Sequence, residues 1–448
     1  MVKTITFPNG CRLVYENPHT SFRNTTIEIL CKLGSVNEAN GIYGASHFIE
    51  HMCFKGTKKI PQAKTITENY DKIGAYFNAS TFKEHTSYYV KCFDDYVENS
   101  LHVLSDMILN SLFKKSEYEK ERKVVQEESI RTNDDGEYIT DNMMDAIIYK
   151  GTSYANPVDT LAYHTSKTNP LLHEDALAMY KSFYRPGNIV ISIVSNLSFH
   201  TILGMVKTSY FMKPAKPFCT SDHAWKYRID SFVEPQNEMQ YSIARKPGIS
   251  TAYVQIGFRT CSYYSPDIYA LDILSTILGK GMSSRMFVLL REQNGLTYKS
   301  GAVSNQYGSM GSFVFYAETD PRKMLENGDK PGVLPLIVKM IHDLYKHGIT
   351  QKELNDAKTH LQGSFARYSE NMSNICTYNA IKTAFLNVDD KSHVSYKDFY
   401  STYYAKITRI QVNSIIRKYF KKANGAVCIL GDDVFPLKKV AHICKNLE

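Results

Sequence analysis

One pattern occurs twice in the sequence, and it limits the folds that this chain can adopt. An apolar and β-branched run, a short loop and an apolar helical segment follow one another at residues 23–54. The same order returns in the second half of the chain, at residues 250–287. Self-similarity within a chain is typical of duplicated structural units. We therefore expect an α+β protein with two homologous α/β-sandwich domains, each an antiparallel-rich sheet flanked by helices; the alternative is one large mixed domain.

The length of the chain agrees with two large domains. The chain has 448 residues, which exceeds one ordinary core, since domains average about 150 residues. Residues 211–227 carry two prolines and no sustained period, which is typical of a linker. We accordingly predict an N-terminal domain at residues 1–215, a linker at 216–236 and a C-terminal domain at 237–448.

Composition narrows the classes of function and the compartment. Hydrophobic residues make up 43% of the chain and charged residues 22%, and no apolar run approaches the length of a membrane span. The net charge of +8 is dispersed, which gives nucleic-acid binding no support. Nine cysteines without a Cys-x-x-Cys pair indicate reduced thiols. The N-terminus reads as a β-hairpin rather than a signal or transit peptide, so we expect a cytoplasmic protein that binds neither membranes nor nucleic acids.

The segment GASHFIEHMCFKGT, residues 44–57, carries the clearest chemical signal. His47 and His51 are four residues apart, so both side chains reach one point in space if the segment is helical. Neutral imidazoles bind a borderline metal such as zinc, and Glu50 beside them can accept a proton from water. The order His-x-x-Glu-His is the inverzincin signature. The alternative is a surface helix with incidental histidines.

A third protein ligand is expected, because catalytic zinc usually keeps three. Four residues of one helical segment share a face, and two of them are carboxylates: Glu121, Val124, Val125 and Glu128. Burying a carboxylate costs several kcal/mol unless a cation pairs with it, so this stripe indicates a cation. Glu127 lies about a hundred degrees around the helix, which favours Glu128 as the ligand. Salt bridges to lysine or arginine are the alternative.

With these residues the chain resembles the pitrilysin-type metallopeptidases of family M16, particularly the mitochondrial processing peptidase-like branch. In that family a ligand glutamate follows the motif at a fixed distance, which is matched here by the 76 residues between His51 and Glu128. Glu121 matches a further family glutamate that supports the site. The resemblance therefore implies a ligand set of His47, His51 and Glu128, with one Zn²⁺ per chain.

The resemblance extends to a strand that would bind substrate. The stretch YFNASTFKEHTSYYV, residues 76–90, is similar to the edge strand of the family, to which the substrate backbone adds. The resemblance implies substrate contacts at Asn78 and Ala79. Glu84 matches another family carboxylate near the site.

A second motif, in the C-terminal half, resembles the family's Arg/Tyr pair. Arg291 and Tyr298 flank a Gly-Leu step in the stretch REQNGLTY. In the family these two side chains stabilise the scissile carbonyl as it becomes an oxyanion, a task suited to a guanidinium and a phenol donor. The resemblance implies a catalytic group of Glu50, Arg291 and Tyr298, supported by Glu121. The chain departs from the family at residues 151–160, where a His-Pro-Leu-Gly type of loop is common.

Together these features predict a zinc-dependent endopeptidase that hydrolyses peptides or extended protein segments. The alternatives are a noncatalytic structural subunit of the same fold and a metal-dependent binding protein without turnover. In single-chain members of the family with four domains, the zinc lies in the first domain and the Arg/Tyr pair comes from the fourth. The resemblance therefore implies that two chains of this size pair, as a homodimer or as a heterodimer with a related chain.

Overall fold

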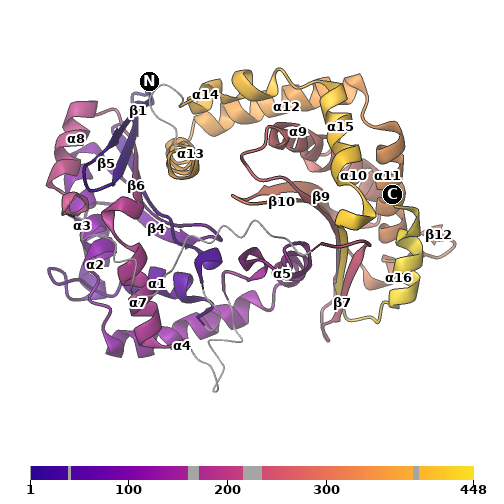
Figure 1. The fold of residues 1–448 in the computed structure, drawn as a ribbon, viewed down its shortest axis with the longest axis horizontal. Coiled ribbons are helices and arrows are strands. Elements are labelled where there is room, and N and C mark those ends of the chain that lie inside the picture. The colour runs from indigo at the N-terminus through magenta and orange to yellow at the C-terminus, as the bar shows by residue number, and fades with distance from the viewer. Residues whose placement is uncertain (1, 39–41, 160–170, 215–234, 387–392, 448) are drawn as a thin grey trace. The chain divides into compact units, whose positions relative to one another are not determined.

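The computed structural model describes residues 2–38, 42–159, 171–214, 235–386 and 393–447. Its described residues form two compact units, and neither unit is one continuous stretch of sequence (Figure 1). Most of unit 1 comes from the first half of the chain and most of unit 2 from the second half.

The two units differ from the predicted domains at two places. Residues 131–156 belong to unit 2, although they lie in the N-terminal half, and residues 366–398 belong to unit 1. The predicted linker at 216–236 lies outside the described residues, except for its last two. The linker-like stretch at residues 211–227 begins inside unit 1, because Phe211 is fully buried in its core. The Asn9 side chain also donates to the Phe211 carbonyl at 2.8 Å.

Unit 1 contains a six-stranded sheet with the order β1-β2-β6-β3-β5-β4. Its strands are β1 (Val2–Thr6), β2 (Arg12–Glu16), β3 (Asn24–Cys31), β4 (Tyr76–Thr81), β5 (Thr86–Phe93) and β6 (Ile189–Val194). β2 and β6 are parallel, and the other neighbouring pairs are antiparallel. β4 lies at an edge of the sheet, with Asn78 opposite Tyr89 and Ala79 opposite Tyr88 of β5.

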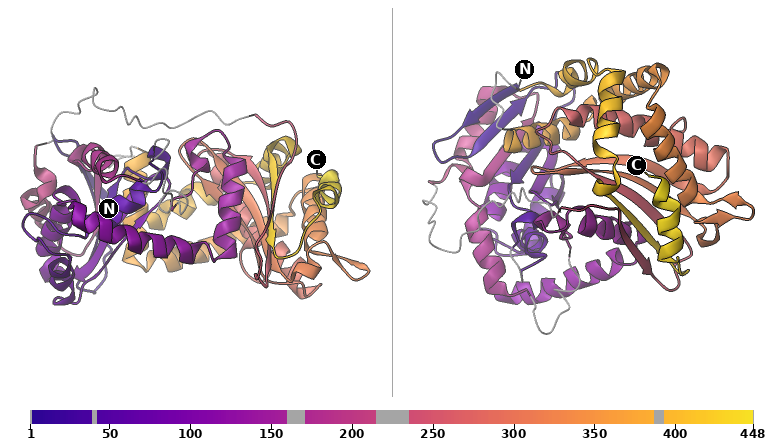
Figure 2. Two further views of the ribbon diagram at one scale, coloured as in Figure 1. Left: turned by 90° about the horizontal axis from the view of Figure 1, so that it is seen from below. Right: turned by 45° about the vertical axis from the view of Figure 1, so that its right-hand side comes forward.

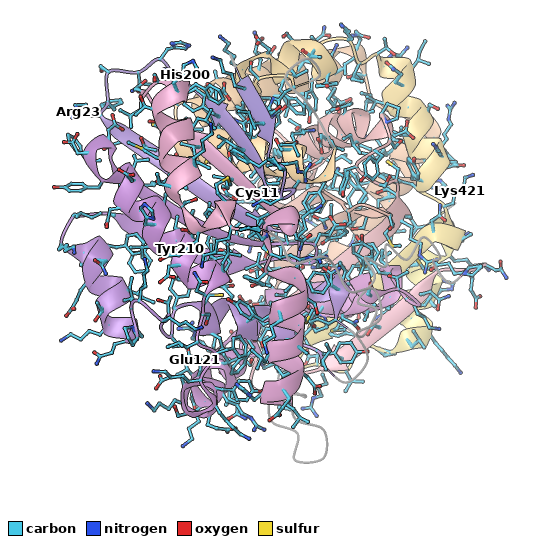
Figure 3. All side chains as sticks on the ribbon, turned by 60° about the vertical axis from the view of Figure 1, so that its left-hand side comes forward. Cys11, Arg23, Glu121, His200, Tyr210 and Lys421 are labelled. Atoms are coloured by element: carbon cyan, nitrogen blue, oxygen red, sulfur yellow. The ribbon has the colours of Figure 1, made fainter. Side chains whose placement is uncertain are left out.

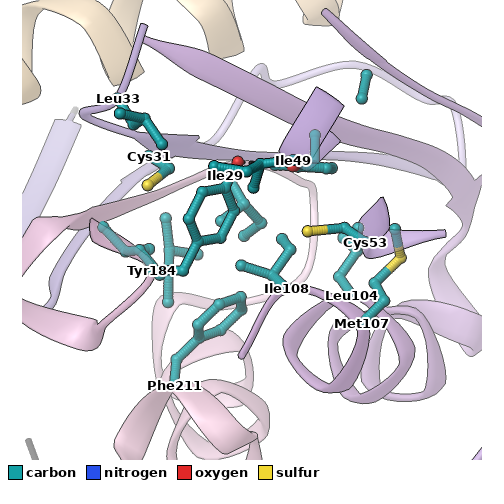
Figure 4. Packing of buried hydrophobic residues seen from close by; sticks show 14 of the residues in the cluster. Ile29, Cys31, Leu33, Ile49, Cys53, Leu104, Met107, Ile108, Tyr184 and Phe211 are labelled. Carbon is teal, nitrogen blue, oxygen red and sulfur yellow. Dashed lines mark hydrogen bonds between the residues drawn. The ribbon is translucent and has the colours of Figure 1, made fainter. Parts of the chain in front are cut away.

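Helices pack on both faces of this sheet. They are α1 (Ala45–Cys53), α2 (Ala63–Asp71), α3 (Val97–Leu109), α4 (Lys115–Thr132), α7 (His173–Phe183), α8 (Phe199–Thr208) and α13 (Met372–Phe385). β6 shows how the faces are divided: Ile191 packs into the large core with α1, α3, α7 and α8, whereas Val190 packs against α13. Figure 4 shows part of the large core, where Cys53 of α1 lies beside Leu104 and Met107 of α3. The period-two alternation of the strand thus buries both of its faces.

The face under α13 also contains buried polar groups. Glu28 of β3 is only 3% exposed, and its carboxylate accepts hydrogen bonds from the hydroxyls of Ser87 and Thr377. Asn379 of α13 donates to the carboxylate of Glu16 at 2.8 Å. α13 is therefore fixed on the sheet by specific hydrogen bonds as well as by apolar contacts.

Unit 2 contains a five-stranded sheet with the order β7-β13-β8-β10-β9, and a separate pair of short strands, β11 and β12. The strands are β7 (Gln240–Arg245), β8 (Ala252–Thr260), β9 (Thr297–Gln306), β10 (Gly311–Thr319), β11 (Glu326–Asn327), β12 (Lys330–Pro331) and β13 (Gly425–Gly431). Its helices are α5 (Gly136–Ile148), α9 (Asp267–Gly279), α10 (Arg285–Phe287), α11 (Val333–His347), α12 (Gln351–Ser369), α15 (Arg409–Tyr419) and α16 (Leu437–Ile443). The last four residues of α12 belong to unit 1, and so does α14 (Tyr396–Phe399) except for Phe399.

The two sheets have the same topology. The order β2-β6-β3-β5-β4 in unit 1 corresponds strand for strand to β7-β13-β8-β10-β9 in unit 2. In both sheets the first of these pairs is parallel and the others are antiparallel. This agreement, down to the position of the parallel pair, confirms the duplicated α+β fold that the sequence predicts.

α5 packs on the sheet of unit 2 much as α13 packs on that of unit 1 (Figure 2). The approach is close, because a Cβ atom at Gly257 would lie 2.6 Å from the sulfur of Met144 on α5. Among the described residues, no helix is long and apolar enough to cross a membrane.

Candidate active site and metal centre

The two histidines of the motif lie on one face of α1. The helix begins after Gly44, whose φ of +81° is in the left-handed region that favours glycine. Its buried face, which includes Phe48, Ile49 and Met52, packs into the core of unit 1. His47 and His51 are left on the other face, partly accessible to solvent.

Glu128 of α4 joins the two histidines. The Nε2 atoms of His47 and His51 are 3.2 Å apart. The Oε2 atom of Glu128 lies 3.4 Å from Nε2 of His51 and 3.9 Å from Nε2 of His47. These three are the group of possible metal ligands that the described part of the chain contains.

The spacing of these donor atoms fits a zinc ion. Bonds of about 2.0–2.1 Å in a tetrahedral arrangement hold ligand atoms about 3.3 Å apart. The three observed separations lie between 3.2 and 3.9 Å. Two imidazoles and one carboxylate are also the donor types that catalytic zinc sites use. His47, His51 and Glu128 therefore meet the chemical and geometric requirements of such a site.

Glu121 fixes the orientation of the His51 ring. Its Oε1 atom is 2.9 Å from Nδ1 of His51, and its Oε2 atom is 2.5 Å from Nζ of Lys55. Figure 3 labels Glu121, which belongs to α4. A carboxylate on Nδ1 holds the proton there and leaves Nε2 free for a metal. Lys55 is a partner that sequence reasoning missed.

The protonation properties of the histidines indicate a site that attracts positive charge. Burial would lower the pKa of His51, but the hydrogen bonds of Glu121 and Glu128 outweigh it and raise that pKa to about 9. The pKa of His47 is lowered, by burial and by the neighbouring His51. Without a metal the carboxylates thus stabilise a proton on one imidazole, in a place where a cation would have the same partners.

Glu50 lies beside the histidines and is held by the edge strand. Its Oε2 atom accepts a hydrogen bond of 2.5 Å from the hydroxyl of Thr81, the last residue of β4. Burial raises the pKa of Glu50 above its ordinary value, which brings a carboxylate closer to the range of an effective general base. Thr81 carried no signal in the sequence, because its role depends on the fold of β4 next to α1.

The face of α4 differs in one respect from the predicted stripe. Glu121 and Val125 are buried and Glu128 is 35% exposed, as a partly accessible ligand would be. Val124, however, is 52% exposed and does not belong to the buried face. Glu127 is exposed and lies outside the group of possible ligands. The predicted common face of α4 is therefore confirmed for Glu121 and Glu128, and it is wrong for Val124.

The substrate-binding residues predicted from the family lie on and after β4. Asn78 is exposed and Ala79 is buried, as alternation along the strand requires. The side-chain oxygen of Asn78 accepts a hydrogen bond from the backbone N–H of Ala79 at 2.9 Å. Glu84 lies in the turn between β4 and β5. Their contact with a substrate stays a prediction.

Arg291 and Tyr298 belong to unit 2. Arg291 lies in a π-helical turn, η6 (Val288–Glu292), and such turns are common at functional sites. Its guanidinium is 5.5 Å from the centre of the Tyr298 ring. Tyr298 is 91% exposed, which is unusual for an aromatic side chain at the start of a strand. The fold thus brings the two predicted residues together within their own unit.

This set of donors on an α+β scaffold is that of the inverzincin metallopeptidases. Residues 13–160 match the family model described as insulinase (peptidase family M16), and residues 171–361 match the model described as the peptidase M16 inactive domain. The chain belongs to peptidase family M16. Assignment to the mitochondrial processing peptidase-like branch stays a prediction.

Relatives and solved structures agree with this membership. A protein of Bacillus subtilis named as an uncharacterized zinc protease is 32% identical over 365 residues, which cover 81% of this chain and 83% of the relative. One from Streptomyces coelicolor with a similar name is 28% identical, over 81% of this chain and 76% of the relative. A protease from Helicobacter pylori has the same fold, with a TM-score of 0.84, 22% identity and coverage of 96% and 99%.

Proposed function

We propose that this protein is a zinc-dependent endopeptidase that hydrolyses peptides or extended protein segments. The observation that carries this proposal is the meeting of His47, His51 and Glu128 within 3.9 Å, directly beside Glu50. A structural protein of the same fold has no need for ligands, a base and an orienting carboxylate in one place. The match to the M16 inactive domain covers residues 171–361, and these four residues lie before that range, within residues 13–160 that match the insulinase model.

His47, His51 and Glu128 would hold the metal. Zinc, when bound, supplies the positive charge that makes water more acidic and polarises a carbonyl group. Glu50 would accept the proton of the attacking water and later deliver it to the leaving amine. Thr81 keeps the Glu50 carboxylate in place by its hydrogen bond, and Glu121 keeps His51 in the correct tautomer.

The substrate would bind as an extended strand beside β4. Among the described strands β4 pairs with β5 alone, so its other edge offers backbone N–H and C=O groups to a peptide. Its last residue, Thr81, is the one that bonds to Glu50. A peptide along β4 would therefore pass next to the proposed base. We assign stabilisation of the oxyanion to Arg291 and Tyr298, by resemblance to the family.

Metal content and cleavage together test this function. Purified protein should contain zinc and cleave an unstructured peptide, lose cleavage on treatment with a chelator, and regain it when zinc is restored. Cleavage that survives complete removal of zinc would contradict the proposal. A zinc-loaded protein that cleaves no peptide in a diverse library would favour the noncatalytic alternative.

We further propose that two chains pair, so that Arg291 and Tyr298 of one chain serve the metal centre of another. If the partner is an identical chain, an inactive Glu50→Gln protein mixed with an inactive Tyr298→Phe protein should recover activity. Each heterodimer would have one site with both changes and one with neither, which gives up to about half of the normal turnover. Mass spectrometry of differently tagged chains verifies exchange. Verified heterodimers without activity would contradict a homodimer and indicate a related partner chain.

A further inference from the structure

We propose that Glu38 is a positioning residue, which holds the metal-binding helix α1 in register with the edge strand β4. Glu38 lies in the segment before α1, and nothing in the motif His-x-x-Glu-His refers to it. The inference rests on the proposed function, and it adds a residue that controls metal affinity and turnover without touching either the metal or the substrate.

The carboxylate of Glu38 binds the first turn of α1. Its Oε2 atom accepts a hydrogen bond from the N–H of Gly44 at 2.7 Å, and its Oε1 atom accepts one from the N–H of Ser46 at 2.8 Å. The first N–H groups of a helix have no partner within the helix, and the N-cap here is a glycine without a side chain to bind them. Glu38 therefore replaces the missing cap from outside the helix, through two hydrogen bonds from backbone N–H groups.

Glu38 is buried at this contact. Only 6% of its surface is exposed. Burial raises its pKa to about 8, and the two backbone N–H groups oppose that rise because they stabilise the charged form. A buried carboxylate is costly unless its hydrogen bonds are made, so this contact is a specific one.

The segment that carries Glu38 is bound at its other end to the turn after β4. The N–H of Ser35 donates to the carbonyl of Phe82 at 3.3 Å, and the N–H of Val36 donates to that of Lys83 at 2.9 Å. Gly34 lies so close to this turn that a Cβ atom would be 2.3 Å from the Phe82 carbonyl. Residues 34–38 thus connect the end of β4 to the start of α1.

This connection matters because the two histidines are held differently. His51 has Glu121 on its Nδ1 atom. The Nδ1 atom of His47 is buried and has no hydrogen-bond partner among the described residues. The position of His47 therefore depends on the backbone of α1, one residue after the N–H that Glu38 binds. A second link, from Thr81 to Glu50, lies further along the same helix. If the first turn shifts, His47 and Glu50 lose their common geometry with β4, and small misplacements reduce rates strongly.

The test compares Glu38→Gln with a matched control, Glu28→Gln. Both residues are buried carboxylates of unit 1 with two hydrogen bonds each, but Glu28 lies under α13 and its partners are hydroxyls. In Glu38→Gln one N–H of α1 must face an amide NH₂ group, so one of the two bonds is lost. We expect the zinc affinity of this variant to fall about tenfold, which is the lower end of the 10–100-fold loss that follows when a group orienting a metal ligand is removed. Competition with a chelator on folded protein measures this affinity. For zinc-saturated enzyme, kcat should fall with little change in KM.

Glu28→Gln should change the stability of the protein but leave zinc affinity within about twofold of the original, since it touches neither α1 nor β4. Equal zinc affinity and equal kcat in the two variants would overturn the inference and reduce Glu38 to a structural residue. If Glu38→Gln does not fold, Glu38→Asp replaces it, since it keeps the charge and shortens the reach by one methylene. Zinc affinity unchanged in that variant would also overturn the inference. Failure of the proposed function is distinct, because it appears in the unmodified protein as absence of zinc or of cleavage.

Discussion

Units 1 and 2 have sheets of the same strand order, but they differ in the helix that follows the corresponding strands β3 and β8. In unit 1 this helix is α1, which presents two histidines and a glutamate on its accessible face. In unit 2 it is α9, which has 13 residues, nine of them buried, and no histidine. Unit 2 therefore has the same sheet topology with no histidine on the corresponding helix. The comparison teaches that the metal chemistry is an addition to one copy of the fold, made on one face of one helix.

One carboxylate from each unit, Glu121 of unit 1 and Asp141 of unit 2, shows a difference in electrostatic surroundings. In unit 1 burial would raise the pKa of Glu121, but hydrogen bonds with His51 and Lys55 outweigh it and lower that pKa. In unit 2, Asp141 of α5 is bonded by the uncharged amide of Gln255 at 2.5 Å. Burial and the nearby acids Asp145 and Glu137 raise its pKa to about 6. Glu121 is therefore stabilised as an anion by two cationic partners, whereas the surroundings of Asp141 favour its neutral acid.

The largest effect is expected from Glu50→Gln. This change removes the proposed general base from unit 1 and leaves its three metal ligands in place, so unit 1 would bind zinc but, like unit 2, lack catalysis. The amide fills the same space and keeps a partner for Thr81, but it cannot accept a proton. Cleavage should fall by about 10²–10⁴-fold, the usual contribution of a general base. Zinc content should stay unchanged, which mass analysis can verify in the same sample. Full cleavage by this variant would refute the role of Glu50.

A comparison of two adjacent glutamates tests which face of α4 binds the metal. Glu128→Gln should weaken zinc binding by about 100-fold or more, because loss of a ligand exceeds the 10–100-fold cost of losing an outer partner. Glu127→Gln is the matched control, since that side chain is exposed, and its zinc affinity should stay normal. If Glu127→Gln weakened zinc binding and Glu128→Gln did not, Glu127 would be the ligand, and a different face of α4 would point to the metal.

The smallest effect concerns the acid of unit 2. Because folding raises the pKa of Asp141 from 3.8 to about 6, this group contributes stability below about pH 4 that is lost as the pH rises through 6. Asp141→Asn should remove that dependence and increase stability at pH 7. Asp141 is exposed, so solvent screening limits the gain to about 1 kcal/mol or less.

Urea denaturation at pH 4.5 and pH 7 measures this difference. Asp343→Asn, at an exposed position of α11, is the control and should change stability by no more than about 0.5 kcal/mol. A loss of stability at pH 7 in Asp141→Asn would mean that the carboxylate is stabilised as an anion. In that case the contrast between the two units would not hold.

Much of the fold was available from local sequence patterns. The repeated strand-loop-helix order at residues 23–54 and 250–287 predicted the duplication. The spacing of His47 and His51 predicted a common point because α-helical geometry is fixed over four residues. Choosing Glu128 over Glu127 needed only the angle between successive helical residues.

The remaining features depend on contacts between distant parts of the chain. Residues 131–156 and 366–398 form helices that pack on the sheet of the opposite half, and helix patterns do not say which sheet an apolar face will meet. Thr81, Lys55 and Glu38 have ordinary polar side chains, and they acquire a role only when β4, α4 and the start of α1 come together. The spacing of Val124 places it on the predicted stripe, but in the structure its side chain faces solvent, because Glu121 and Val125 fill the buried face of α4.

The central claim, that one unit alone contains the metal centre, is tested most directly by the zinc content of the chain. Elemental analysis of purified protein and of His51→Ala should be made at equal protein concentration, with circular dichroism to verify that both are folded. The account predicts one zinc ion per chain in the original protein and none in His51→Ala, with the fold retained, because unit 2 shows that this architecture does not need a metal. Two zinc ions per chain, or zinc retained by folded His51→Ala, would contradict it.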